Sequence, residues 1–209
     1  YKEISDLFIK TGRLQSIIML FIFSGFIVFG KGFIAIWAGK NYSESYIITL
    51  IFFGSLFIPL IQNTGITILQ ARNQMKFRSI LYLAISVVSL GFQIYLSKEM
   101  GPIGCAIAIG GALIFGQGII MNIYYQAYQH IAIGIFWKEI IKMIPIPVFF
   151  TIGGIILNNY FDYSKLGVLA CGIAIYTILY LVLFFQFGMN QYEKNLLRNP
   201  IKKFLKHRT

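Results

Sequence analysis

The side chains of this chain that could do chemistry are isolated polar groups inside long apolar stretches. One is a lysine, the only charge well inside an apolar run, and the others are neutral amides. They are Lys31, Gln62, Asn63, Gln93, Gln117 and Asn122. Polar groups at membrane depth usually face a bundle interior or a wet cavity, whereas their competing role is a hydrogen bond between two helices, worth about 0.6 kcal/mol. The six residues are therefore candidates for lining a substrate cavity, with helix packing as the alternative.

Two of these candidates have a sequence context that bears on their role. Lys31 lies six residues before Trp37, about 9 Å along a helix, so its stem could carry the ammonium to the membrane interface. If the helix unwinds at Gly30 and Gly32, the lysine would instead face a cavity and meet an anionic group. Gln62 follows Pro59 by three residues, and a proline inside a helix removes a backbone hydrogen bond.

The residues that catalysis or metal binding would need are not assembled in the sequence. It has no metal-binding histidine pair, no phosphate-binding loop and no nucleophile next to a base. Cys105 and Cys171 lie in apolar runs beside small residues, where cysteine behaves as a small hydrophobe. We therefore expect neither an enzyme nor a cofactor or metal site.

Composition indicates the elements that must position the candidates. Hydrophobic residues make up 57% of the chain and charged residues 12%, too apolar a composition for a water-soluble domain of this size. In lipid, backbone groups must pair within helices or closed barrels, and continuous apolar runs exclude the alternating barrel pattern. The sequence predicts an all-α, polytopic membrane bundle of six transmembrane helices. They cover residues 14–37, 46–69, 80–96, 103–125, 143–160 and 166–187.

The basic residues are sorted between the gaps that separate these stretches. Of the 18 lysines and arginines, 14 lie before the first stretch, in every second gap or in the tail. Because Lys and Arg of short loops stay in the cytoplasm, both ends of the chain are predicted to be cytoplasmic. The net charge of +11 is explained by this topology, so no nucleic-acid partner is expected.

The sequence divides into a membrane lobe, residues 1–188, and a basic tail, residues 189–209. In the tail, Asn199 and Pro200 are typical of a helix start. Apolar and basic residues then alternate at helical spacing, which predicts an amphipathic cytoplasmic helix on the membrane lipids. Within the fourth stretch, small residues recur every four positions and favour close packing of two helices. They are Gly104, Ala108, Ala112 and Gly116.

Three ordered passages carry a resemblance to a known family. Residues 33–39, FIAIWAG, are followed by Tyr42; residues 70–76 read QARNQMK; and residues 101–108 read GPIGCAIA. Together they resemble passages of bacterial oligosaccharide and polysaccharide flippases of the MOP superfamily, the O-antigen flippase type. The first resembles the end of that family's seventh helix, the second its next short basic loop, and the third the start of its tenth helix.

The resemblance implies that this chain is the C-terminal lobe of a transporter of the bacterial cytoplasmic (inner) membrane. A related N-terminal lobe of the same protein would be its missing partner. Family members flip undecaprenyl-diphosphate-linked sugar repeat units by alternating access, as in lipopolysaccharide and other polysaccharide biosynthesis, often with ion coupling. The chain departs from such coupling because it shows no acidic residue at membrane depth. Any proton or sodium site would then belong to the missing lobe.

Three alternatives remain open at the level of sequence. A multidrug or metabolite exporter of the same fold typically relies on membrane-embedded carboxylates, which this part of the sequence lacks. A membrane enzyme of surface-polysaccharide assembly would share the hydropathy but would need clusters of Arg, His or Asp in the outer loops. A structural membrane subunit would tolerate apolar replacement of all the polar candidates.

Overall fold

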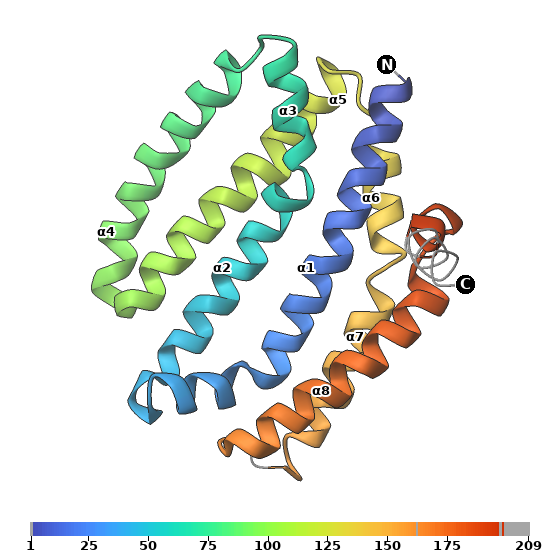
Figure 1. Ribbon diagram of the computed structural model, residues 1–209. Coiled ribbons are helices and arrows are strands. Elements are labelled where there is room, and N and C mark those ends of the chain that lie inside the picture. The colour runs from blue at the N-terminus through green and yellow to red at the C-terminus, as the bar shows by residue number, and fades with distance from the viewer. Residues whose placement is uncertain (1, 162, 197, 199–209) are drawn as a thin grey trace.

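The chain folds into a bundle of helices, as the computed structural model shows for residues 2–161, 163–196 and 198 (Figure 1). No strand occurs in this part of the chain, which confirms the all-α fold class. The helices are α1 (Lys2–Trp37), α2 (Ser43–Ile61), α3 (Asn63–Ala71), α4 (Lys76–Leu113), α5 (Met121–Ala127), α6 (Ile133–Ile141), α7 (Pro145–Leu157) and α8 (Leu166–Leu183). A short 3₁₀ turn, η1 (Lys40–Tyr42), precedes α2, and π-helical turns follow α4 and α8 as η2 (Ile114–Ile120) and η3 (Phe184–Gly188). The tail helix predicted from Asn199 lies outside the described residues.

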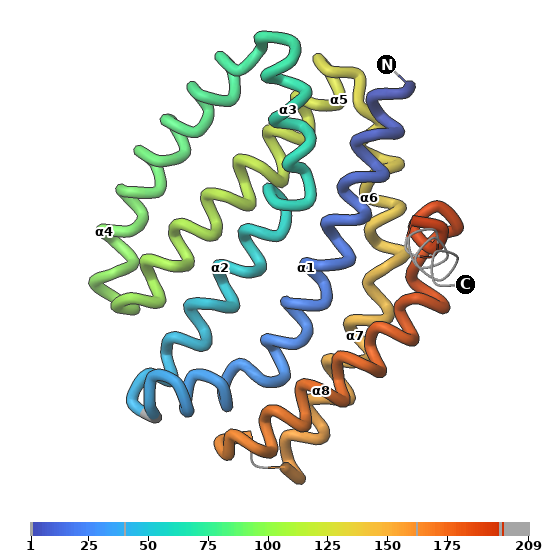
Figure 2. The backbone as a smooth tube through the Cα atoms, viewed as in Figure 1, coloured from blue at the N-terminus to red at the C-terminus, as the bar shows by residue number. Residues whose placement is uncertain are grey.

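Within the described residues, five segments are long and apolar enough to cross a membrane. They are Lys2–Trp37, Ser43–Ala71, Lys76–Ala127, Ile133–Leu157 and Leu166–Gly188. The third contains two of the predicted stretches, because the chain reverses at Gly101, whose φ of 58° lies in the left-handed region that glycine tolerates. Figure 2 shows the resulting hairpin, with one arm before Gly101 and one after it. The six apolar stretches thus occupy six helical arms.

Three boundaries differ from those that hydropathy predicts. α1 begins at Lys2 rather than near Leu14, because one face of its first turns, with Ser5 and the fully buried Phe8, packs against the bundle. The second stretch is not one helix but breaks at Gln62, three residues after Pro59, into α2 and α3. Residues 133–141, predicted as loop, form α6.

α1 is the central helix of the bundle and packs against α2, α3, α6, α7 and α8. Close approach depends on small residues. A Cβ added at Gly12 would lie 2.8 Å from the carbonyl oxygen of Ile61, and one added at Gly154 would lie 2.4 Å from a methyl group of Val28. Larger side chains at these positions would push α2 and α7 away from α1.

The hairpin of α4 packs through the small-residue stripe that the sequence predicted. A Cβ at Gly104 would lie 2.2 Å from the carbonyl oxygen of Leu96, and one at Gly116 would lie 1.9 Å from Ile85. Ala108, between them on the stripe, is buried. The stripe therefore faces the first arm of the same hairpin.

A buried ion cluster joins three segments far apart in the sequence. The Arg13 guanidinium of α1 donates to both carboxylate oxygens of Glu193, at 2.6 and 3.1 Å, and to Glu139 Oε2 of α6 at 3.0 Å. Glu193 also accepts the backbone N–H of Asn190 at 2.8 Å, while the Asn190 side chain accepts the N–H of Glu193 at 2.9 Å, a reciprocal helix cap. We call Arg13, Glu139 and Glu193 the Arg13 cluster. Glu139 lies on a helix of the segment Ile133–Leu157, not in a loop.

Candidate functional site

A groove runs over α1 between α2 and α7. It consists of two cavities of about 980 and 330 Å³ that share Ile27. The larger one lies at the Trp37 end of α1 and also borders the α7–α8 turn, residues 158–165. The smaller one continues from Ile27 to Leu20 along α1. We call the two cavities together the α1 groove.

Helical periodicity explains why these residues share the groove. Side chains three or four positions apart lie on one face of a helix, and Leu20, Ser24, Ile27 and Lys31 follow this spacing along α1. The wall formed by α7 and the residues that flank it has the same spacing and consists of Ile144, Pro147, Val148, Thr151, Ile152, Ile155, Asn158 and Asn159. One continuous face of each helix therefore lines both cavities.

Gly54 lines the smaller cavity from α2 without a side chain to fill it. A Cβ added there would meet only the ring of Phe23, at 3.9 Å, which is ordinary van der Waals contact. The space beside Gly54 is therefore open groove and not packed protein.

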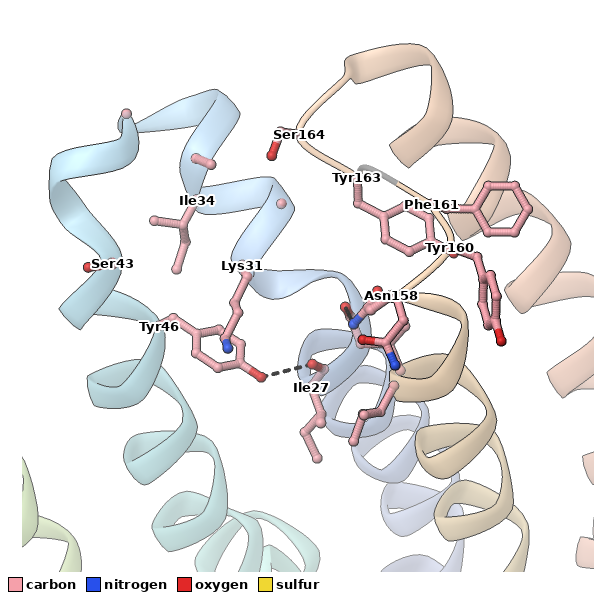
Figure 3. Close-up of a pocket in the computed structure, with 16 residues that line it drawn as sticks. Ile27, Lys31, Ile34, Ser43, Tyr46, Asn158, Tyr160, Phe161, Tyr163 and Ser164 are labelled. Carbon is pink, nitrogen blue, oxygen red and sulfur yellow. Dashed lines mark hydrogen bonds between the residues drawn. The ribbon is translucent and has the colours of Figure 1, made fainter.

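Lys31 projects into the larger cavity (Figure 3). Its Nζ lies 5.3 Å from the centre of the Tyr46 ring, within the range of a cation–π contact. The Tyr46 hydroxyl donates to the carbonyl oxygen of Ile27 at 2.8 Å, which fixes the ring beneath the ammonium. The sequence predicted a cavity-facing Lys31 only if the helix unwinds at Gly30 and Gly32, and α1 does not unwind there. The Lys31 side chain nevertheless lines the cavity, from an intact helix.

The opposite side of this cavity is neutral and polar. Asn158 ends α7, and its Nδ2 donates to the carbonyl oxygen of Val28 at 3.1 Å, which joins α7 to α1. Tyr160, Tyr163 and Ser164 of the α7–α8 turn complete this side, as Figure 3 shows. Burial raises the pKa of the Tyr163 phenol, so it remains neutral near pH 7. Among the described lining residues, Lys31 is the one ionised side chain, which makes this cavity suited to an anion.

The smaller cavity is apolar. Phe23, Phe57 and Val148 are among its lining residues, and its two hydroxyl groups belong to Ser24 and Thr151. Both hydroxyls are hydrogen-bonded to their own helices, at 2.6 Å to the Leu20 carbonyl oxygen and at 2.8 Å to that of Pro147. The α1 groove thus changes from cationic and polar to apolar along its length.

Two of the predicted amides meet at the helix break, away from the groove. Gln62 Nε2 donates to Asn122 Oδ1 at 2.6 Å, and Asn122 Nδ2 donates to the Gly118 carbonyl oxygen at 2.6 Å. With its side-chain amide turned to satisfy both polar atoms, Gln15 of α1 donates to the carbonyl oxygens of Leu60 and Ile61 beside the break, at 3.0 and 3.2 Å. These contacts favour the packing interpretation for Gln62 and Asn122.

The other three amides lie at separate places. Gln93 donates to Ser89 at 3.1 Å within the first arm of α4. Gln117, buried in η2, donates to the Tyr82 hydroxyl and joins the two arms of the hairpin. Asn63 is exposed at the start of α3. Of the six candidates, Lys31 alone lines the α1 groove.

Sequence reasoning missed the residues that surround Lys31. Tyr46, Tyr160 and Tyr163 are not among the residues singled out from the sequence, nor is the adjacent pair Asn158 and Asn159. The sequence feature that could have indicated them is the row of groove-lining residues at helical spacing along α7, which ends in Asn158 and Asn159. Its spacing alone could not show that it faces Lys31, because that depends on how α7 is rotated against α1.

The described residues contain no group of three His, Cys, Asp or Glu side chains placed to hold a metal ion. No protein-family model, curated protein or solved structure matches this chain.

Proposed function

We propose that the chain is one lobe of a transporter that moves lipid-linked oligosaccharides across the bacterial cytoplasmic membrane by alternating access. The observation that carries this proposal is the α1 groove, which offers a cation, amides and phenols at one end and an apolar surface at the other. The three passages that resemble oligosaccharide flippases support the same substrate class. A related N-terminal lobe would form the other side of the substrate path.

The groove offers each part of such a substrate a matching surface. The Lys31 ammonium is placed to bind a phosphate of the diphosphate link by a charge-assisted hydrogen bond. The amides of Asn158 and Asn159 offer donors and acceptors for sugar hydroxyls, and the phenol rings nearby offer apolar faces with polar tips. Movement across the membrane needs no covalent step, in keeping with a site made of neutral groups and one lysine.

The first prediction tests this role of Lys31. Full-length protein is reconstituted in vesicles with a fluorescent polyprenyl-diphosphate oligosaccharide, and transport is measured as the change in the fraction that an impermeant quencher reaches. We expect Lys31→Gln to slow transport roughly 10-fold or more, because a hydrogen bond to a charged group contributes about 1.5–3 kcal/mol. Lys31→Arg should retain most of the rate.

Lys98→Gln is the matched control, because Lys98 is an exposed lysine outside the groove. It should leave the rate unchanged. Wild-type rates from Lys31→Gln would contradict the role of Lys31. Vesicles that move a labelled phospholipid but not the oligosaccharide lipid would contradict the proposed substrate class.

A further inference from the structure

We propose that the α1 groove holds a phosphate-headed lipid in the orientation of the outer leaflet, with the phosphate at Lys31 and one hydrocarbon chain extending from Ile27 toward Leu20. This inference deepens the proposed function and rests on it only in taking the ligand to be a lipid. It adds the place where the hydrocarbon chain of the lipid binds, the direction in which that hydrocarbon chain runs and the leaflet to which the bound lipid belongs.

The length of the groove matches one leaflet. Lys31 and Leu20 are eleven residues apart on an unbroken helix, which corresponds to about 16 Å. The hydrocarbon core of a bilayer is about 30 Å thick, so one leaflet contributes roughly half of that. A chain that starts at Lys31 and follows α1 to Leu20 therefore ends near the middle of the membrane.

The polarity of the groove selects an amphipathic ligand over a soluble anion. The cation and the amides are confined to the larger cavity, and the smaller cavity offers mainly aromatic and aliphatic side chains. The two hydroxyl groups in the smaller cavity already donate to backbone oxygens. A free anion would use only the first part of this surface, whereas a lipid would use both.

The direction of the groove sets the leaflet. Lys31 lies toward the Trp37 end of α1, and the charge sorting that underlies the proposed topology puts that end outside. A lipid that ran in the opposite direction along the groove would place its phosphate against Phe57 and Ile144, near the middle of the membrane. The groove therefore fits a lipid that has reached the outer leaflet, before it leaves the protein.

A second apolar groove provides an internal comparison. It has a volume of about 450 Å³, lies between α7 and α8, and is lined by Phe149, Gly153 and Leu157 on another face of α7. It meets the larger cavity at Val28, Phe161 and Tyr163, which line both. The described residues that line it include no charged side chain. With no cation to bind the phosphate, it lacks the feature that selects the proposed ligand.

Photolabelling of the full-length protein in nanodiscs tests the proposal. The probes are a polyprenyl phosphate and a phosphatidylglycerol, each with a photoactivatable group on the chain, and a neutral polyprenol with the same group. We expect the phosphate-headed probes to label peptides that contain Phe23, Phe57 or Val148. Lys31→Gln should reduce this labelling at least five-fold, and excess inorganic phosphate should not compete.

Gly54→Leu tests the path of the chain independently of the charge, because its side chain would enter the smaller cavity beside Phe23. It should also reduce labelling at least five-fold. Gly91→Leu on α4 and Gly153→Leu in the second groove are matched controls, since an added Cβ at either position meets no atom within 4 Å. Both should label like the wild type.

Each outcome bears on one of the two proposals. Equal labelling by the neutral polyprenol, labelling confined to the second groove, or no effect of Gly54→Leu would overturn the lipid site. Labelling by phosphatidylglycerol but not by polyprenyl phosphate would uphold the site and contradict the oligosaccharide carrier. Transport that depends on Lys31 without labelling of the groove would uphold the function and overturn the site.

Discussion

At the scale of single residues, Arg13 shows how one charge can have two roles. In the sequence it is one of the basic residues from which the topology is predicted, and in the fold its side chain is 5% exposed and joined to two carboxylates. Burial of an ion pair is costly unless its remaining polar groups are bonded. Here the Glu139 carbonyl oxygen, the Gly188 carbonyl oxygen and the Asn190 N–H supply those bonds.

We predict that Arg13→Gln lowers the free energy of unfolding by about 3–5 kcal/mol, because it leaves the buried Glu193 carboxylate without its cationic partner. Arg13→Met combined with Glu193→Leu should recover most of this loss, since no unpaired charge remains. Unfolding in mixed detergent micelles measures the effect. Lys142→Gln is the control, because the Lys142 side chain is 58% exposed and such a pair contributes only about 0–1 kcal/mol.

At the scale of elements, the α4 hairpin has almost no loop, because the chain turns at Gly101 and continues as a helix from Pro102. The two arms are then held together by small residues and by amide contacts. Gly104 touches the backbone of Leu96, and Gln117 donates to Tyr82 across the hairpin. Larger side chains should therefore destabilise the hairpin strongly on the face where its two arms meet and weakly on the face that points away from the other arm.

We predict that Gly104→Ala destabilises the protein by about 1–3 kcal/mol, because its Cβ would collide with the Leu96 carbonyl oxygen and force the arms apart. Gly91→Ala lies on the first arm, where a Cβ meets no atom within 4 Å, and alanine favours the helix by up to about 1 kcal/mol. The melting temperatures of the two variants in detergent should move in opposite directions. A loss at Gly91 equal to that at Gly104 would contradict this packing.

The sequence could predict elements that depend on local patterns, and it did so for the apolar stretches, the all-helical fold and the small-residue stripe. It could not predict contacts that depend on helix rotation. Gln62 and Asn122 are 60 residues apart, and their hydrogen bond requires that α2 break at Gln62. Lys31 could be singled out from its charge alone, whereas Asn158 becomes part of the site only because α7 crosses α1 at Val28 and Gly154.

At the scale of the whole molecule, the connections lie at two ends. Figure 1 shows the start of α1 and the α3–α4 and α5–α6 connections at one end, and the α1–α2 turn, the turn of the α4 hairpin and the α7–α8 turn at the other. The first end carries most of the basic residues outside the tail, which include Lys2, Arg72 and Lys76. This arrangement is what the proposed topology requires.

The topology predicts which positions an impermeant thiol reagent reaches in intact cells. In full-length protein with Cys105 and Cys171 replaced by alanine, Lys98→Cys and Lys165→Cys should react from outside. Lys76→Cys and Lys142→Cys should react only after the membrane is permeabilised. All four lysines are exposed, so differences in labelling report the side of the membrane. Reaction of Lys76→Cys in intact cells would reverse the proposed orientation.

The Arg13 cluster also has a consequence for how the protein is made. Arg13 and Glu193 are 180 residues apart, and ribosomes add roughly 5–20 residues per second. Roughly 10 to 40 s therefore pass between the synthesis of Arg13 and the synthesis of Glu193. During that interval Glu139, 126 residues after Arg13, is the one carboxylate of the Arg13 cluster that can pair with it. The central helix is thus made before the helices that pack around it, and its buried arginine gains its full set of partners only after Glu193 has been synthesised.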